Sequence, residues 1–159
     1  MSKKQKTNAC RILDQHKISY ILHEYYDSTA ISGKDVADFL NENHDEIYKT
    51  LVLQGKSGEY YVMIVSAAAK IDLKKAAKFV GEKSIQMIPQ KDLEALTGYV
   101  HGGCSPIGMK KIFKTVIQSD AFEKEKIYLS AGRVGLQLEI NPNDLQKVIS
   151  IQSGDIIEE

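Results

Sequence analysis

Two strand-like segments joined by a tight turn limit the fold of this chain more than any other feature of its sequence. The segments "IYKTLVLQ" (47–54) and "EYYVMIVS" (59–66) are rich in β-branched and aromatic residues, and "GKSG" (55–58) separates them. Such runs across a short glycine-containing loop are typical of an antiparallel β-hairpin. A hairpin in mid-chain argues against the strict strand–helix alternation of parallel α/β folds.

The other segments mix helices and strands without a regular repeat. Capping residues or apolar periodicity predict helices over 6–17, 31–43, 72–81, 89–98 and 141–150. Composition predicts further strands over 18–26, 84–88, 114–118, 126–132 and 135–140. We therefore expect one α+β domain spanning residues 1–159, with a mixed, mostly antiparallel sheet surrounded by helices.

Charge and cysteine content narrow the function classes. Lys+Arg and Asp+Glu both total 21, so the formal charge is zero, which is unlike a general nucleic-acid coat. The two cysteines are too few for a structural zinc site and fit a reducing compartment. No apolar run is long enough to span a bilayer, and the start of the chain has no apolar leader stretch. We expect a cytoplasmic protein with no membrane or DNA partner.

The stretch "TGYVHGGCSPIGMKK" (97–111) carries the first candidate chemistry. Cys104 and His101 could form a nucleophile and base, although a buried cysteine is more often inert. The glycines either make a tight connection or offer backbone N–H groups to a substrate oxygen. Elsewhere, Lys49 shares a strand face with Ile47 and Leu51, and a lysine on a core face points to a function.

Two groups of lysines could hold RNA phosphates by charge, or could simply be solvated. They lie at 70, 74, 75 and 78 and at 110, 111 and 114. The candidates for RNA contact are Lys74, Lys75, Lys110 and Lys111.

Four segments together resemble the YbaK/ProX-type aminoacyl-tRNA editing domains, and most closely the free-standing YbaK (EbsC-like) deacylases. They are "IYKTLVLQ", "DLKKAAKFVG", "TGYVHGGCSPIGMKK" and "IYLSAGRVGLQLEI", in this order. The resemblance implies an α+β fold with a barrel-like sheet. It implies hydrolysis of the ester that joins a mischarged cysteine to tRNA(Pro). It also implies prolyl-tRNA synthetase as a partner, and no metal or cofactor.

The resemblance also assigns site residues. The invariant family lysine falls on Lys49, which is the expected catalytic residue, and a family position often held by Asp is Gln137 here. The substrate-binding residues that it implies are Tyr25, Thr50, Gly102, Gly103, Ser130 and Gln137. An amide at position 137 loses the charge but still donates and accepts hydrogen bonds.

In the mechanism proposed for the family branch, the substrate's own thiol attacks its ester, so the enzyme needs no nucleophile. Under that reading, Lys49 binds the substrate and backbone N–H groups of the Gly102–Gly103 loop receive the oxyanion. Three alternatives stay open. They are a deacylase of another mischarged tRNA, such as Ala-tRNA(Pro), using a positioned water; a non-catalytic tRNA- or synthetase-binding module; and a Cys104–His101 hydrolase.

Overall fold

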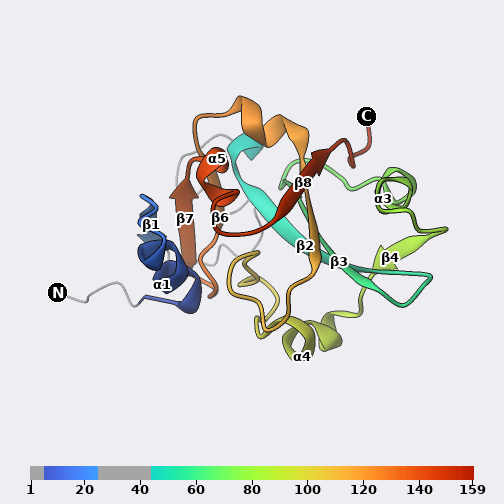
Figure 1. Ribbon diagram of the computed structural model, residues 1–159, viewed down its shortest axis with the longest axis horizontal. Helices are drawn as coiled ribbons and strands as arrows, with labels where there is room; N and C mark the ends of the chain where they lie inside the picture. The colour runs from blue at the N-terminus through green and yellow to red at the C-terminus, as the bar shows by residue number, and fades with distance from the viewer. Residues whose placement is uncertain (1–5, 25–43) are drawn as a thin grey trace.

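The structure is a computed structural model, which describes residues 6–24 and 44–159 (Figure 1). Tyr25 and the helix expected over 31–43 lie outside these residues. The described helices are α1 (Asn8–Gln15), α3 (Leu73–Val80), α4 (Leu93–Thr97) and α5 (Pro142–Leu145), with 3-10 turns at His44–Glu46, Gln90–Asp92 and Ser119–Glu123. The strands are β1 (Ile21–Glu24), β2 (Tyr48–Gly55), β3 (Tyr60–Ser66), β4 (Ile85–Met87), β5 (Lys114–Gln118), β6 (Ile127–Ser130), β7 (Leu136–Ile140) and β8 (Ile151–Gly154).

Local sequence signals set several of these elements. Strands β2 and β3 form the expected antiparallel hairpin, in register from Tyr48 opposite Ser66 to Gln54 opposite Tyr60. Helix α3 begins after Asp72, whose side chain accepts from the N–H groups of Lys74 and Lys75, and Gly81, with φ 80°, caps its C-terminal end. The hairpin and the doubly capped helix are confirmed.

The strands form two sheets. The order in the larger sheet is β4-β2-β3-β5-β8, and the order in the smaller is β1-β7-β6. Pairing is antiparallel except that β5 lies parallel to both β3 and β8, so the expected mixed, mostly antiparallel pattern is confirmed. The expected barrel-like closure is wrong for the described chain, because only an isolated bridge between Ile47 and Tyr128 joins the sheets.

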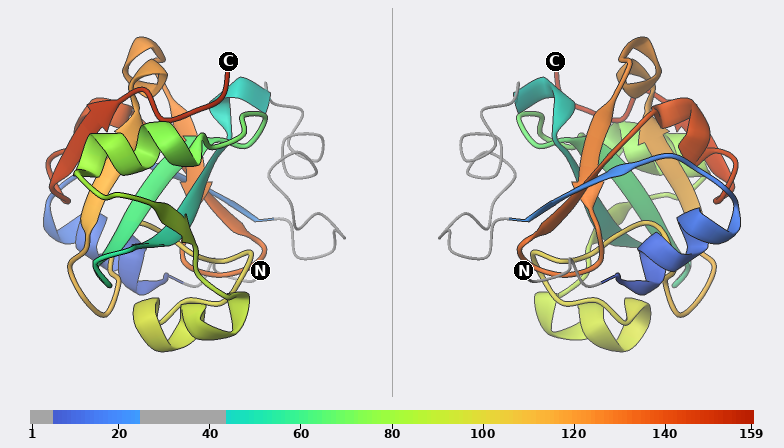
Figure 2. Two further views of the ribbon diagram at one scale, coloured as in Figure 1. Left: turned by 90° about the vertical axis from the view of Figure 1, so that its right-hand side faces the viewer. Right: turned by 90° about the vertical axis from the view of Figure 1, so that its left-hand side faces the viewer.

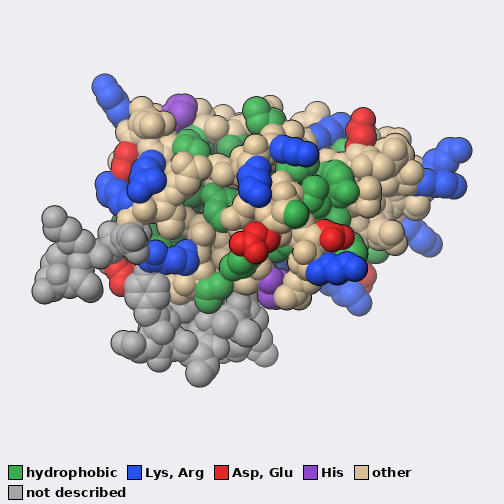
Figure 3. All heavy atoms as spheres, turned by 90° about the horizontal axis from the view of Figure 1, so that it is seen from below, with side chains coloured by type: hydrophobic (Ala, Val, Ile, Leu, Met, Phe, Trp, Pro, Cys, Tyr) green, Lys and Arg blue, Asp and Glu red, His purple; other side chains and the backbone are tan. Residues whose placement is uncertain are grey.

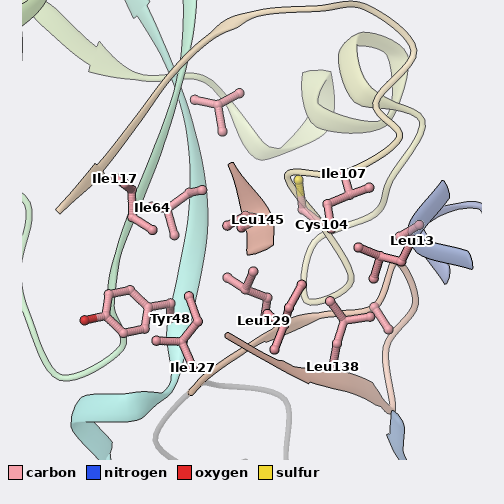
Figure 4. Packing of buried hydrophobic residues seen from close by; sticks show 14 of the residues in the cluster. Leu13, Tyr48, Ile64, Cys104, Ile107, Ile117, Ile127, Leu129, Leu138 and Leu145 are labelled. Atoms are coloured by element: carbon pink, nitrogen blue, oxygen red, sulfur yellow. The ribbon is translucent and has the colours of Figure 1, made fainter. Parts of the chain in front are cut away.

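Apolar side chains fill two layers. The larger cluster lies between the two sheets and α1, with Ile64, Leu129 and Leu138 fully buried in it (Figure 4). The second cluster lies on the other face of the larger sheet, where α3 covers Leu53 and Met63 (Figure 2, left). None of the described helices has both the length and the apolar character needed to cross a bilayer.

The end of the chain differs from expectation. The helix expected over 141–150 is short, since α5 ends at Leu145, although Asn141 does cap it as predicted. Strand β8 was not predicted from the sequence, and it extends the larger sheet beside β5. The polar sequence "IQSG" is a weak strand signal, and it is the parallel pairing with β5 that makes it a strand.

Candidate functional site

A cavity of about 510 Å³ opens along the first half of β2. Three other segments enclose it: the stretch from β4 to α4, the glycine-rich loop that follows α4, and the paired strands β6 and β7. The described lining residues are Ile47, Tyr48, Lys49, Thr50, Leu51, Val52, Ala67, Met87, Ile88, Gln90, Leu93, His101, Gly102, Cys104, Ser130 and Gln137. A cavity of this size suits a small ligand or the end of a larger one.

The cavity exists because the sheet edge is interrupted at this point. Strand β2 pairs with β4 only over Leu53–Gly55, and the last contact on this side is from Ile88 N–H to the carbonyl of Val52, at 3.2 Å. At its other end β2 meets β6 through the single bridge at Ile47. Between these two points β2 has no strand neighbour on this edge within the described residues.

Lys49 extends from this open part of β2. Its Nζ donates to the carbonyl oxygen of Ala69 at 2.9 Å, and burial lowers the pKa of its ammonium group. An ammonium has three N–H groups, so this contact leaves two for other partners. Lys49 is therefore held at the cavity wall by one hydrogen bond, and its ammonium group can donate two more.

The turn that carries Ala69 separates this cavity from a second one. Ser66 Oγ accepts from Ala68 N–H at 3.3 Å, and the carbonyl of Ser66 accepts from Ala69 N–H at 3.0 Å. Ala67 lines the first cavity, whereas Ala68 and Ala69 line the second, of about 460 Å³. This turn could not be predicted from residue types, because it contacts Lys49 through a backbone carbonyl.

Three polar side chains line the cavity near Lys49. Ser130 and Gln137 are directly opposite each other on β6 and β7, and both are buried. Ser130 Oγ accepts from Gly132 N–H at 3.2 Å, which fixes its position. The Oγ1 of Thr50 is buried and has no hydrogen-bond partner in the part of the chain that the structure describes.

The two glycines of the loop have different surroundings. Gly102 lines the cavity in a left-handed conformation, with φ 86°, which favours glycine. Gly103 instead packs against the turn after β6, where a Cβ atom would lie 2.8 Å from the Val134 nitrogen. The N–H of Gly103 already donates to the carbonyl of Val100 at 3.0 Å. Of the pair, Gly102 is the one that lines the cavity.

Cys104 and His101 both line the cavity, but their chemistry does not match a nucleophile and base. Cys104 is only 8% exposed and points into the core cluster (Figure 4). Burial raises the pKa of its thiol to about 12, so the thiol stays protonated. His101 is exposed to solvent, whereas Cys104 is buried.

The four lysines proposed to contact RNA fall into two kinds. The Nζ of Lys75 lies 3.0 Å from the Asp155 carboxylate and 2.9 Å from the Ile157 carbonyl, so it ties the chain end to α3. Lys74, Lys110 and Lys111 are exposed. Seen from the side of α4, basic groups are interspersed with acidic and apolar ones and form no continuous basic face (Figure 3).

Sequence reasoning missed one wall of the cavity. Met87, Gln90 and Leu93 lie on β4, on the 3-10 turn after it and at the start of α4, and all three line the cavity. Met87 is 44% exposed, a feature that is visible only in the folded chain.

Comparison with known proteins gives consistent matches. The model of the "Aminoacyl-tRNA editing domain" family matches residues 28–148. The "Putative Cys-tRNA(Pro)/Cys-tRNA(Cys) deacylase EbsC" of Enterococcus faecalis is 41% identical over 155 residues, which are 97% of this chain and 93% of that protein. A proline–tRNA ligase of Thermosipho africanus is 24% identical over 84% of this chain, which corresponds to 25% of the ligase.

Two solved structures share the fold. The crystal structure of hypothetical protein APE2540 has a TM-score of 0.88 at 19% identity, and the match covers 96% of this chain and all of that one. The structure described as "a putative trans-editing enzyme for prolyl tRNA synthetase" has a TM-score of 0.83 at 21% identity, covering 98% of this chain and all of that one.

Proposed function

The chain belongs to the aminoacyl-tRNA editing domain family, and we propose that it is a trans-editing deacylase that removes cysteine mischarged onto tRNA(Pro). The relative from Enterococcus faecalis, which spans almost the whole chain, supports this substrate. We take residues 1–159 as one editing domain and place it in the cytoplasm.

One observation carries the mechanism. The cavity offers groups that can position a substrate, but its described lining contains no activated nucleophile, because the Cys104 thiol is buried and protonated. A site of this kind suits a reaction in which the substrate brings its own nucleophile. In Cys-tRNA, the substrate's sulfur forms a bond to its own ester carbonyl, the bond to the ribose oxygen breaks, and the thiol proton passes to that oxygen.

The reaction itself can distinguish cysteine from other small amino acids on the tRNA. A pocket alone discriminates one small group by only ~1–3 kcal/mol. A thiol with an ordinary pKa of about 8.5 is a few per cent ionised at neutral pH, far more than a hydroxyl, and alanine has no attacking group. Holding the thiol near the ester can contribute up to ~7–11 kcal/mol, so the protein's task is positioning.

Residue roles follow from this task. Lys49 binds the ribose–phosphate end or the ester carbonyl with the N–H groups that Ala69 leaves free. The Gly102 backbone receives the developing negative charge, while Thr50, Ser130 and Gln137 shape the polar floor. Tyr25 is a further substrate contact, proposed from the resemblance to the editing-domain family alone.

Recognition of the tRNA body requires little from this chain. The formal charge is zero, and on the face seen in Figure 3 basic side chains are interspersed with acidic and apolar ones. We therefore propose weak, salt-sensitive tRNA binding, with tRNA(Pro) selected by an associated prolyl-tRNA synthetase. The similarity to part of a proline–tRNA ligase supports this partner.

The test is deacylation of cysteinyl-, alanyl- and seryl-tRNA(Pro) by the wild type and by Lys49→Ala. Lys56→Ala is the matched control, because Lys56 is exposed in the turn at the far end of β2. Rapid release from cysteinyl-tRNA alone, lost in Lys49→Ala and kept in the control, is the expected result.

Other outcomes separate the alternatives. Equal cleavage of alanyl-tRNA would replace the thiol mechanism with a positioned water. Binding without cleavage of any aminoacyl ester would make the chain a non-catalytic module. Near-normal turnover by Lys49→Ala would remove Lys49 from the mechanism.

A further inference from the structure

The main chain of β2 directs alternate residues toward the gap in the sheet. The Ile47 carbonyl accepts from Ala67 N–H, and Gly55 N–H donates to the Glu59 carbonyl, so the odd-numbered residues bond β3. The Val52 carbonyl accepts from Ile88 N–H on the opposite edge. Because bonding direction alternates along an antiparallel strand, the N–H and C=O of Thr50 also point to that edge.

In the part of the chain that the structure describes, no strand lies beside Thr50 on this edge. The pairing with β4 begins beyond it at Leu53, and the bridge to β6 lies before it at Ile47. Among the described residues no backbone hydrogen bond satisfies Thr50 on this side, and its Oγ1 also has no partner. Backbone polar groups away from water are almost always paired, so this residue has binding capacity at the cavity wall.

The charge of the cavity limits how it can hold an amino acid. Its described lining contains the ammonium of Lys49 and no carboxylate. The α-amine of an aminoacyl ester therefore meets only neutral acceptors there. A backbone carbonyl is the strongest neutral acceptor that β2 offers.

An aminoacyl ester has the same donor and acceptor arrangement as one residue of a strand. Its α-amine and its ester carbonyl are attached to one α-carbon, as N–H and C=O are in a peptide. Residues in a hydrogen-bonded antiparallel pair exchange two bonds, one in each direction. Thr50 can exchange both bonds with such a group, as a sheet edge does with an added peptide strand.

We propose that the main chain of Thr50 binds the aminoacyl group as a single added strand residue. The Thr50 carbonyl accepts from the substrate's α-amine, and the Thr50 N–H donates to the ester carbonyl oxygen. This deepens the proposed function and rests on it. It also means that the enzyme reads the part common to all amino acids, and that the substrate's thiol decides which ester is cleaved.

The test uses amide hydrogen exchange measured by NMR on the full chain. One probe is 3′-deoxy-3′-(L-alanylamino)adenosine, which keeps the amine and carbonyl but cannot be hydrolysed as an ester. The second probe is its propionylamino counterpart, which lacks the amine. Leu51 is the internal control, because its N–H points to β3, opposite Met63.

In the free chain, we expect the Thr50 amide to exchange at least tenfold faster than that of Leu51. Saturation with the alanyl probe should slow Thr50 exchange at least tenfold and leave Leu51 unchanged. The propionyl probe should bind at least tenfold more weakly, which corresponds to ~1.4 kcal/mol.

Two results would overturn the inference. One is a Thr50 amide as protected as that of Leu51 in the free chain, and the other is equal affinity for both probes with Thr50 exchange unchanged. Deacylation of cysteinyl-tRNA by the same preparation distinguishes a failure of this inference from a failure of the proposed function. Cleavage with an unresponsive Thr50 overturns only this inference, whereas no cleavage and no response overturns the proposed function as well.

Discussion

The state of Cys104 gives the most quantitative prediction. Its side chain is 8% exposed, and burial raises the pKa of its thiol to about 12. At pH 8 a thiol with the ordinary pKa of about 8.5 is roughly 20% ionised, whereas one with pKa about 12 is ionised to only about 0.01%. Since the thiolate is the reacting form, alkylation should be slowed roughly 1000-fold, and more once steric shielding is included.

The assay is reaction with iodoacetamide at pH 8, followed by mass spectrometry of the peptide that contains Cys104. Free cysteine gives the reference rate, and the chain unfolded in urea shows that the same peptide reacts normally once it is exposed. Deacylation should continue while Cys104 remains unmodified, and Cys104→Ser should remain active. Alkylation of the folded chain at the rate of free cysteine, with activity lost in parallel, would refute the reasoning and restore the Cys104–His101 hydrolase.

Three further predictions concern the site and its rim. Lys49→Met should abolish deacylation without lowering the free energy of unfolding in urea at pH 7. Because burial lowers the pKa of Lys49, the wild type should gain unfolding free energy relative to Lys49→Met as pH rises toward 10.5. A wild type that instead lost stability relative to this variant between pH 7 and 10 would contradict burial as the cause. Gly103→Ala should cost about 1–3 kcal/mol of unfolding free energy and slow turnover, since the new Cβ would lie 2.8 Å from a backbone nitrogen; an unchanged melting temperature would contradict it. Replacing Lys110 and Lys111 together by alanine should raise KM for tRNA, leave kcat unchanged, and reduce the slope of log affinity against log salt by about one or two; an unchanged slope would remove them from the RNA contact.

Sequence signals predicted the parts of the fold that are decided locally. The β2–β3 hairpin and helix α3 follow from a short turn and from capping residues that act within a few positions of themselves. Strand β8 could not be predicted, because its pairing depends on β5, a partner distant in sequence. The same holds for the two separate sheets, whose relative position is set by long-range packing.

The site was predictable to a similar extent. The resemblance named Lys49, Thr50, Gly102, Ser130 and Gln137, and the structure brings all five to one cavity. It did not distinguish Gly102 from Gly103, because that difference depends on the neighbouring turn. The Ala69 carbonyl and the open edge at Thr50 are backbone features, which residue types do not reveal.

The strand order of the larger sheet has a consequence for synthesis on the ribosome. The β2–β3 hairpin joins neighbouring segments and can form early, but β5 pairs with it only after a long intervening stretch, and β8 follows β5 later still in the chain. Contacts between distant segments form slowly, because a long loop must close first. Until β8 emerges, β5 is an exposed edge able to pair with another chain. The larger sheet therefore stays prone to misassembly until β8 has been made and has paired with β5.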